Sequence, residues 1–234
     1  MSAAIRVVHI PKFRSSRVVW MYHELQELYG SNVPNLELTT FKDISSFRLN
    51  KPQWLLDINP NGKVPTMVHG PVVMFEGGAI CSYLIDLFDT DRKLLPRDAE
   101  AMSIYYMMVS WCASTLDNLM ATSSPIAIVL DRATAPKPMD DVDTNHKYFV
   151  EILVPYFSKQ INKSGGPYLC GAQFTAADVI LGYFLLRATD KFVPAWVSPT
   201  ENPDMYVYVQ LLLQRPALQK AICPVEQESS TLST

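Results

Sequence analysis

Apolar residues in the first third of the chain recur with two different periods, which together predict a small α/β unit. Alternating apolar and polar positions predict strands over residues 5–10 and 35–41. Between these strands an apolar residue returns every three or four positions, which predicts a helix built on Val18, Met21, Leu25 and Leu28.

A β-hairpin and another helix are predicted after a short helical turn over residues 52–58. Thr66–His69 and Val72–Phe75 have strand-like composition and are separated by a Gly70-Pro71 turn. Gly77 and Gly78 then open a segment with helical spacing. The predicted order is therefore βαβ, a short helix, then ββα.

The rest of the chain shows helical spacing without β alternation. Thr175 and Asp178 form a capping-box pattern at the start of a very apolar helix, which predicts a buried helix. A proline-containing stretch over residues 123–141 is predicted to be a long connection. The predicted divisions are an α/β domain over residues 1–88, a linker over 89–98, an all-helical domain over 99–223 and a disordered tail over 224–234.

Composition and charge argue against several functional classes. The net charge of −3 and the lack of a basic cluster argue against nucleic-acid binding. No apolar run approaches the roughly 18 residues of a membrane span, and the start of the chain lacks the apolar core of a signal peptide. The four cysteines are scattered without metal-ligand spacing, and the four histidines show none either, so we expect reduced thiols and no metal.

Candidate chemistry gathers around the hairpin. Pro65 keeps Val64 out of a helix, so the N–H and C=O of Val64 are available to an extended peptide. The helix start at Gly77 attracts a carboxylate, and Glu76 beside it could hold an amine. A small peptide with a free α-amine and α-carboxylate would fit such a site.

The motifs here resemble the glutathione site of cytosolic glutathione transferases. The resemblance rests on Asn50-Lys51-Pro52-Gln53-Trp54, Asn59-Pro60-Asn61-Gly62-Lys63-Val64-Pro65 and Phe75-Glu76-Gly77-Gly78-Ala79-Ile80. Two segments are similar to the omega class. One is the Lys-Pro-x-Trp sequence at the start of these motifs, and the other is Lys93-Leu94-Leu95-Pro96, which follows them. The likeness extends from about Ile5 to about Ala221. It implies a thioredoxin-like domain followed by an all-α domain, in a cytoplasmic homodimer with glutathione as co-substrate.

The resemblance also implies roles for five residues. Lys51 would bind the glycyl carboxylate of glutathione, Val64 would pair through its backbone beside a cis Pro65, and Glu76 would hold the ligand's ammonium. Gly77 stands where a serine is usual, so one hydrogen bond to the γ-glutamyl carboxylate, worth about 1.5–3 kcal/mol, is missing. The alternatives are a solvated loop lysine at position 51 and a helix-start acid at position 76.

The loop before the first helix departs from the family pattern. A serine, tyrosine or cysteine is usual four or five residues before Arg17, where this chain has Phe13 and Lys12. Ser15, with positive potential from Arg14, is the substitute candidate for stabilising the glutathione thiolate, and Ser16 is assigned to the helix cap. The alternative makes Ser15 the cap and Arg14 a solvated cation.

Three aromatic residues of the helical domain, Tyr105, Tyr106 and Trp111, could line a pocket for an electrophile, although such a stripe is also typical of a core. The predicted function is conjugation of the glutathione thiolate to a small apolar electrophile. The alternatives are a glutathione-dependent isomerase or dehalogenase, and a non-catalytic ligand-binding or assembly module.

Overall fold

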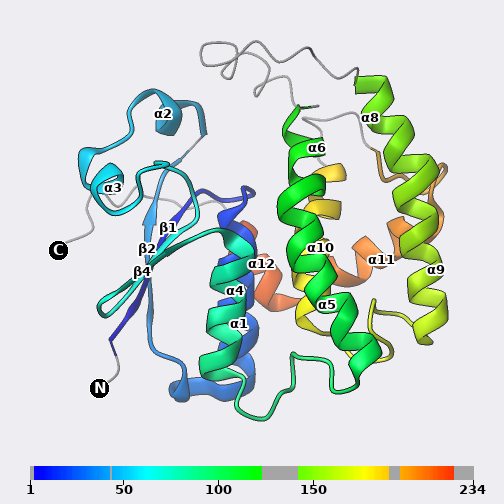
Figure 1. The fold of residues 1–234 in the computed structure, drawn as a ribbon, viewed down its shortest axis with the longest axis horizontal. Coiled ribbons are helices and arrows are strands. Elements are labelled where there is room, and N and C mark those ends of the chain that lie inside the picture. Colours follow the sequence, from blue (N-terminus) through cyan, green and yellow to red (C-terminus); the bar gives the residue numbers. More distant parts are fainter. Residues whose placement is uncertain (1–2, 43, 123–141, 190–195, 224–234) are drawn as a thin grey trace. The chain divides into compact units, whose positions relative to one another are not determined.

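The protein is described by a computed structural model that covers residues 3–42, 44–122, 142–189 and 196–223. Its contacts divide the chain into two compact units. The first comprises Met1–Asp91 together with Arg215–Thr234, and the second comprises Arg92–Gln214. Figure 1 shows the ribbon coloured along the sequence, with strands only in the first unit among the described residues.

A four-stranded mixed sheet forms the framework of the first unit. Its strands are β1 (Ile5–His9), β2 (Leu36–Thr40), β3 (Thr66–His69) and β4 (Val72–Phe75), in the spatial order β2-β1-β3-β4. β1 pairs with β2 in parallel and with β3 antiparallel, and β3 pairs antiparallel with β4. The hairpin has the predicted bounds, and the other two strands lie within the predicted ranges.

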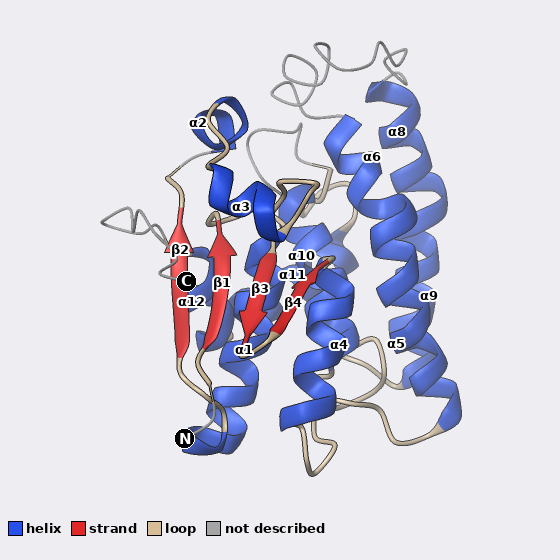
Figure 2. Cartoon of the chain, turned by 60° about the vertical axis from the view of Figure 1, so that its left-hand side comes forward, coloured by secondary structure: helices blue, strands red, loops and turns tan. Residues whose placement is uncertain are grey.

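The first half of helix α1 (Ser15–Tyr29) is buried in the first unit. Residues Ser15–Tyr22 are at most 3% exposed, because the helix packs on the sheet and also contacts α4 (Gly77–Phe88) and α12 (Pro216–Ile222). Figure 2 shows α1 and α4 on the same side of the sheet. Contacts on several sides explain why the buried surface of α1 extends beyond the stripe that the sequence pattern predicted.

Two further short helices lie between β2 and β3. Helix α3 (Gln53–Ile58) was predicted as a helical turn, whereas α2 (Ile44–Leu49) was not predicted. Phe47 of α2 and Leu55 of α3 are buried together with Val8 and Ile10 of the β1 end. Helix α2 has only 6 residues, too few to show a helical period in the sequence, and its packing against this cluster accounts for its place in the unit.

All the regular elements described in the second unit are helices. Its helices are α5 (Ala99–Trp111), α6 (Asp117–Thr122), α8 (Val142–Tyr148), α9 (Val154–Ser164), α10 (Ala176–Ala188) and α11 (Pro203–Leu213). π-Helical stretches at Cys112–Leu116 and Phe149–Leu153 join α5 to α6 and α8 to α9. An α/β unit with a helical unit is the fold class that the sequence predicts. The predicted connection over residues 123–141 and the predicted tail over 224–234 lie outside the described residues.

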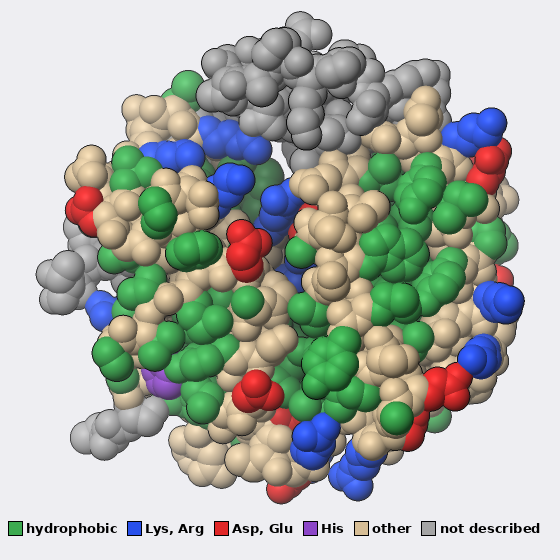
Figure 3. All heavy atoms as spheres, viewed as in Figure 1, with side chains coloured by type: hydrophobic (Ala, Val, Ile, Leu, Met, Phe, Trp, Pro, Cys, Tyr) green, Lys and Arg blue, Asp and Glu red, His purple; other side chains and the backbone are tan. Residues whose placement is uncertain are grey.

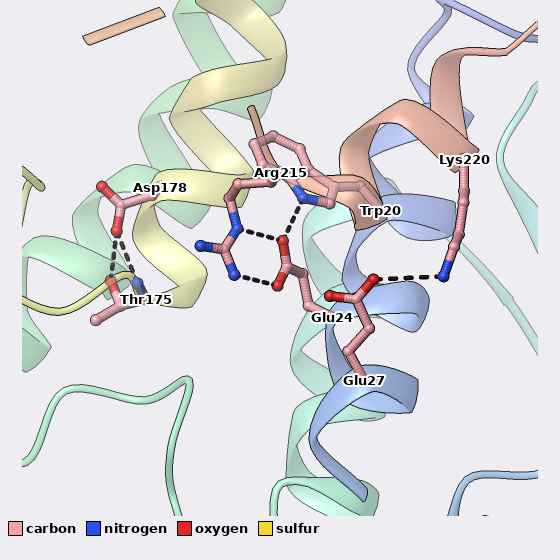
Figure 4. Close-up of polar contacts among 7 residues, drawn as sticks. All are labelled: Trp20, Glu24, Glu27, Thr175, Asp178, Arg215 and Lys220. Atoms are coloured by element: carbon pink, nitrogen blue, oxygen red, sulfur yellow. Dashed lines mark hydrogen bonds and ion pairs between the residues drawn. The ribbon is translucent and has the colours of Figure 1, made fainter. Parts of the chain in front are cut away.

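The predicted capping box is the polar centre of the second unit. The Asp178 carboxylate is 0% exposed and accepts the Thr175 N–H at 2.8 Å, the Leu169 N–H at 3.0 Å and the Tyr208 hydroxyl at 2.7 Å. Figure 4 shows Asp178 beside Thr175 at the start of α10. Burial raises the pKa of Asp178, although these donors favour its ionised form. One side chain therefore links the start of α10 to the preceding loop and to α11.

The contacts group the end of the described chain with the first unit, whereas the predicted domain over residues 99–223 included it in the helical one. Arg215 precedes α12 and donates through Nε to Glu24 Oε1 of α1 at 2.6 Å, and Trp20 Nε1 donates to the same oxygen at 2.7 Å (Figure 4). Lys220 lies 3.3 Å from Glu27. The partners are almost 200 positions apart along the chain, so sequence proximity could not reveal this packing.

Among the described residues there is no helix long and apolar enough to cross a membrane.

Replacing Asp178 with alanine should destabilise the second unit strongly. The Thr175 and Leu169 N–H groups lose their carboxylate partner while they stay buried, so we expect a loss of about 3 kcal/mol or more in the free energy of unfolding. Tyr208→Phe is the matched control, because it removes a single donor and should cost about 1–2 kcal/mol. Urea unfolding measures both values. Equal losses in the two variants would contradict this account.

Candidate functional site

Strand register brings three separate parts of the first unit to one edge of the sheet. Val8 pairs with Thr66, and Thr66 pairs with Phe75. The loop that follows β1, the Val64-Pro65 step that precedes β3 and Glu76 after β4 therefore meet at the same edge, which Figure 2 shows at the ends of these strands. These segments carry most of the residues that the sequence analysis selected.

A side-chain network holds the loop that leads to Val64. Asn59 is 0% exposed, and its Nδ2 donates to Lys63 O at 3.2 Å and to Thr66 Oγ1 at 2.8 Å. Its Oδ1 accepts the Asn61 N–H at 3.0 Å. The Val64-Pro65 peptide bond is cis, as predicted. Val64 is half-buried, with its side chain packed against the cluster of Val8, Ile10, Phe47 and Leu55.

Lys51 lies across this loop. Its Nζ donates to Asn61 O at 3.5 Å. A Cβ built on Gly62 would lie 2.9 Å from Lys51 Cδ and 2.7 Å from Leu56 Cδ2, and Gly62 has a φ of +52°. The positive φ and these close contacts both favour glycine at this position. The absence of a side chain at Gly62 thus lets the Lys51 chain pass close to the loop that ends at Val64.

Glu76 has the most unusual backbone of the site residues. Its φ is +74° and its ψ is 108°, a conformation that costs a residue with a side chain about 1–3 kcal/mol. The residue is exposed, and no described residue forms a hydrogen bond or an ion pair with its carboxylate. Strain of this kind is concentrated at ligand-binding positions. A charged side chain is thereby presented to solvent directly before the first turn of α4.

Gly77 is the first residue of α4 and lies close to the first turn of α1. A Cβ built on Gly77 would lie 3.6 Å from Pro65 Cγ, 3.8 Å from Arg17 Nη1 and 3.9 Å from the Arg14 carbonyl oxygen. These are ordinary contact distances, so the position has room for a small side chain. The N-terminus of α4, the cis Pro65 and the first turn of α1 are therefore adjacent, and both helix ends favour an anion.

Ser15 is buried inside the first unit. It is 0% exposed, and its Oγ accepts the Ile10 N–H at 2.9 Å and lies 3.1 Å from Ile10 O and 3.0 Å from His9 Nδ1. A hydroxyl has one hydrogen to donate, and both possible acceptors here are internal. The expectation of a catalytic Ser15 therefore finds no support in its surroundings.

The predicted helix cap by Ser16 is wrong. The N-cap residue of α1 is Arg14, which makes no capping bond through its side chain, and Ser16 Oγ is buried without a partner among the described residues. Phe13, at the position of the family's usual hydroxyl or thiol, packs against the cluster of Val8, Ile10, Phe47 and Leu55. Lys12 before it is exposed and has a φ of +62°.

The three aromatic residues predicted to line a pocket do not share one face of α5. Tyr105 is 2% exposed in the core, and Tyr106 is 64% exposed. The Trp111 ring packs on α9, with its centroid 5.3 Å from the Tyr156 ring. Figure 3 shows hydrophobic side chains gathered on the surface of the helical unit. The centroids of the Tyr105 and Tyr106 rings lie 5.5 Å apart, so these two side chains are neighbours that differ in exposure.

Three residues near the site were not selected from the sequence. Asn59 holds the loop before Val64, Arg17 reaches the start of α4, and His9 binds Ser15. Arg17 is 3% exposed, and a charged residue within an otherwise apolar helical stretch is a signal that could have identified it. Within the described parts of the chain, no group of three or more His, Cys, Asp or Glu residues could hold a metal ion.

Two family models match the chain. Residues 14–87 match the N-terminal domain of glutathione S-transferases, and residues 136–222 match their C-terminal domain. A glutathione S-transferase-like protein of Beauveria bassiana is 29% identical over 174 residues, covering 70% of this chain and 74% of that protein. Glutathione S-transferase 3 of Schizosaccharomyces pombe is 23% identical, covering 96% of this chain and 89% of its own.

Solved structures share the fold. The beta-etherase LigF of a Sphingobium strain superposes with a TM-score of 0.76 at 18% identity, covering 93% of this chain and 98% of its own. A glutathione transferase homologue from Sulfitobacter, solved with bound glutathione, gives 0.73 at 19% identity over 93% and 96% of the two chains. These likenesses confirm the predicted thioredoxin-like domain with a helical domain. The omega-like character stays a prediction.

His9 should make the stability of the first unit depend on pH. Burial, aided by the nearby His23 and opposed by the Ala221 backbone, lowers the pKa of His9 from 6.5 to about 4. The unfolded chain therefore binds more protons than the folded chain between these values, so the stabilisation is complete above about pH 6.5 and is lost as pH falls towards 4. Up to about 3 kcal/mol should be lost. Urea unfolding of the wild type and of His9→Asn from pH 7 to 4 measures this, and equal pH slopes would contradict it.

Proposed function

The chain belongs to the cytosolic glutathione transferase family, and from that premise we propose that it binds glutathione and transfers its thiolate to a small apolar electrophile. The ligand would lie along the sheet edge at which Val64, Glu76 and the start of α1 meet. The enzyme would work by positioning glutathione and stabilising its thiolate, without a covalent enzyme intermediate.

Each end of glutathione would have its own partner in this site. The Glu76 carboxylate would hold the γ-glutamyl ammonium, and the Gly77 N–H at the start of α4 would hold the adjacent carboxylate. The Val64 N–H and C=O would pair with the cysteinyl backbone, in the manner of an added strand, with the cis Pro65 beside them. Lys51, which already lies beside the loop over residues 59–63, would bind the glycyl carboxylate.

The geometry of Glu76 is the observation that supports this proposal most. Its positive φ is unfavourable for a glutamate, yet it directs an exposed carboxylate to the edge where a helix N-terminus begins. An anionic side chain next to an anion-attracting helix end is suited to a ligand that carries an amine and a carboxylate on the same carbon. The γ-glutamyl end of glutathione has this chemistry.

Thiolate stabilisation would come from the N-terminus of α1 and from Arg14. The Ser15 hydroxyl forms hydrogen bonds inside the unit, so we do not assign it to thiolate stabilisation. The first N–H groups of a helix and a nearby guanidinium both favour the anionic form of a thiol. Lys12, exposed in the same loop, would add to the positive potential.

A second candidate function is non-catalytic binding of glutathione or of another ligand. Phe13 favours it, because this side chain packs on a hydrophobic cluster and cannot donate a hydrogen bond to a thiol. A glutathione-dependent isomerase or dehalogenase would use the same glutathione site, and no described contact favours it over conjugation.

Assembly and the electrophile pocket complete the proposal. We expect a cytoplasmic homodimer, for which the exposed apolar side chains of Val73, Phe75 and Leu87 on β4 and α4 offer contact surface. Tyr106 is the exposed member of the three predicted pocket residues, and it keeps that assignment together with Trp111 and Tyr105 as a proposal.

Glu76→Ala should weaken glutathione binding roughly ten- to hundredfold, because a charge-assisted hydrogen bond contributes about 1.5–3 kcal/mol. Asp86→Ala is the matched control, an exposed acid on the same helix but distant from its N-terminus. Titration calorimetry gives the affinities, and circular dichroism confirms folding. Unchanged affinity in the Glu76 variant would remove this residue from the site.

Gly77→Ser should tighten glutathione binding, whereas Gly77→Ala should not. The Cβ fits at ordinary contact distances, so the serine hydroxyl is the only added interaction with the γ-glutamyl carboxylate. The gain should be below about 1.5–3 kcal/mol, because ordering the hydroxyl has an entropic cost. Equal affinities for the serine and alanine variants, measured by calorimetry, would place that carboxylate elsewhere.

A further inference from the structure

His9 links the C-terminal helix to the loop that begins the glutathione site. The residue ends β1, is 2% exposed, and lies with its Nδ1 3.0 Å from Ser15 Oγ. The backbone of Ala221, in α12, forms a hydrogen bond with the ring that favours its protonation. A neutral imidazole has one donor and one acceptor nitrogen. If the other ring nitrogen donates to Ala221, then Nδ1 is the acceptor for the Ser15 hydroxyl.

Ser15 connects the His9 ring to the loop after β1 through a hydrogen bond. Its Oγ accepts the Ile10 N–H at 2.9 Å, and Ile10 O accepts the Phe13 N–H at 3.1 Å. The Phe13 carbonyl then accepts the Ser16 N–H at 2.8 Å in the first turn of α1. Hydrogen bonds therefore close the turn over residues 10–14, and the Ser15 hydroxyl connects its first residue, Ile10, to His9.

Helix α12 is itself fixed firmly enough to serve as an anchor. Ala217, Leu218 and Ala221 are at most 1% exposed, and their helix packs against α1. Arg215 holds the start of the helix through the Glu24 carboxylate, which is 1% exposed and also accepts from Trp20. A displacement of this helix would leave a buried carboxylate without its charged partner, which is costly.

We propose that His9 is a positioning residue for thiol activation, which with Ser15 holds the turn over residues 10–14 against helix α12 and so sets the orientation of the N-terminus of α1. The inference rests on the proposed function, because it assigns a role to the same site. His9 does not touch glutathione in this account. It acts through Ser15 on the N–H groups and on Arg14, which stabilise the thiolate.

The low pKa of the ring supports this role. Burial keeps His9 neutral at pH values well below 7. Nδ1 therefore remains able to accept the Ser15 hydrogen over the range in which a glutathione thiol ionises. The polar or charged residues around the ring include Ser15, Thr40 on β2 and His23 on α1, and His23 further lowers the pKa of His9.

The experiment measures the pKa of the thiol of bound glutathione, from thiolate absorbance against pH, in a double-mutant cycle. His9→Leu and Ser15→Ala should each raise that pKa by about one unit, while glutathione affinity stays within about threefold. The double variant should match the single variants, because both remove the same link. Turnover at neutral pH should fall through kcat with little change in KM.

His9→Asn is the rescue variant, because its amide oxygen can lie close to the position of Nδ1 and accept from Ser15. It should keep the wild-type thiol pKa. His23→Gln, a histidine change in the same unit, is the control and should also keep it. Ser15→Ala is the milder variant if His9→Leu does not fold.

The outcomes separate the inference from the proposed function. Wild-type protein that does not bind glutathione would overturn the proposed function, and the positioning role with it. Wild-type binding with an unchanged thiol pKa in folded His9→Leu and Ser15→Ala variants would overturn the positioning role alone. Additive effects in the double variant would also overturn it, because His9 and Ser15 would then act separately.

Discussion

The register between β1, β3 and β4 is the constraint on which the site depends. Because Val8 lies opposite Thr66 and Thr66 opposite Phe75, segments separated by more than fifty residues reach the same edge of the sheet. A slip of one residue would turn the side chains of β3 to the opposite face and expose Met67, which is now 0% exposed. The hydrophobic core thus fixes the register, and the register places Val64 and Glu76.

The burial of helix α1 depends on α12, a helix from the other end of the chain. Its buried surface is too large for the sheet alone, so α4 and α12 cover other sides. The Glu24–Arg215 pair contributes less to stability than its short contacts imply, because burying two charges has a desolvation penalty. Its main effect is on orientation, because a guanidinium and a carboxylate meet in a fixed bidentate geometry. The pair therefore specifies where α12 lies, and the apolar contacts of Leu218 and its neighbours stabilise it.

The sequence predicted those features whose cause is local. The hairpin bounds, the capping box of Thr175 and Asp178, and the strands follow from turn residues and hydrophobic period. Features that depend on contacts between residues far apart in the sequence were not predicted. Helix α12 packs on α1, which is nearly the whole chain away, and α2 is held by the cluster around Phe47. The site divides in the same way. Glu76 and the cis Pro65 belong to a continuous motif, whereas the hydrogen bonds of Ser15 to His9 and Ile10 are set by the fold and could not be read from the sequence.

The magnitudes decide whether a site with Phe13 in place of a hydroxyl can still activate a thiol. Lowering a thiol pKa from about 8.5 by about two units needs roughly 2.7 kcal/mol of preference for the thiolate. A helix N-terminus supplies about 0.3–1 kcal/mol when exposed and up to about 2 when partly buried. A cation about 4 Å away in surroundings of intermediate polarity interacts with an anion by up to about 4 kcal/mol, which solvent then reduces. Together the α1 N-terminus and Arg14 reach the required amount only if the loop between β1 and α1 is held rigidly, since misdirected N–H groups lose most of this effect. In the proposed mechanism, the hydrogen bonds of Ser15 within that loop would serve to hold it rigid, without contact between its hydroxyl and glutathione.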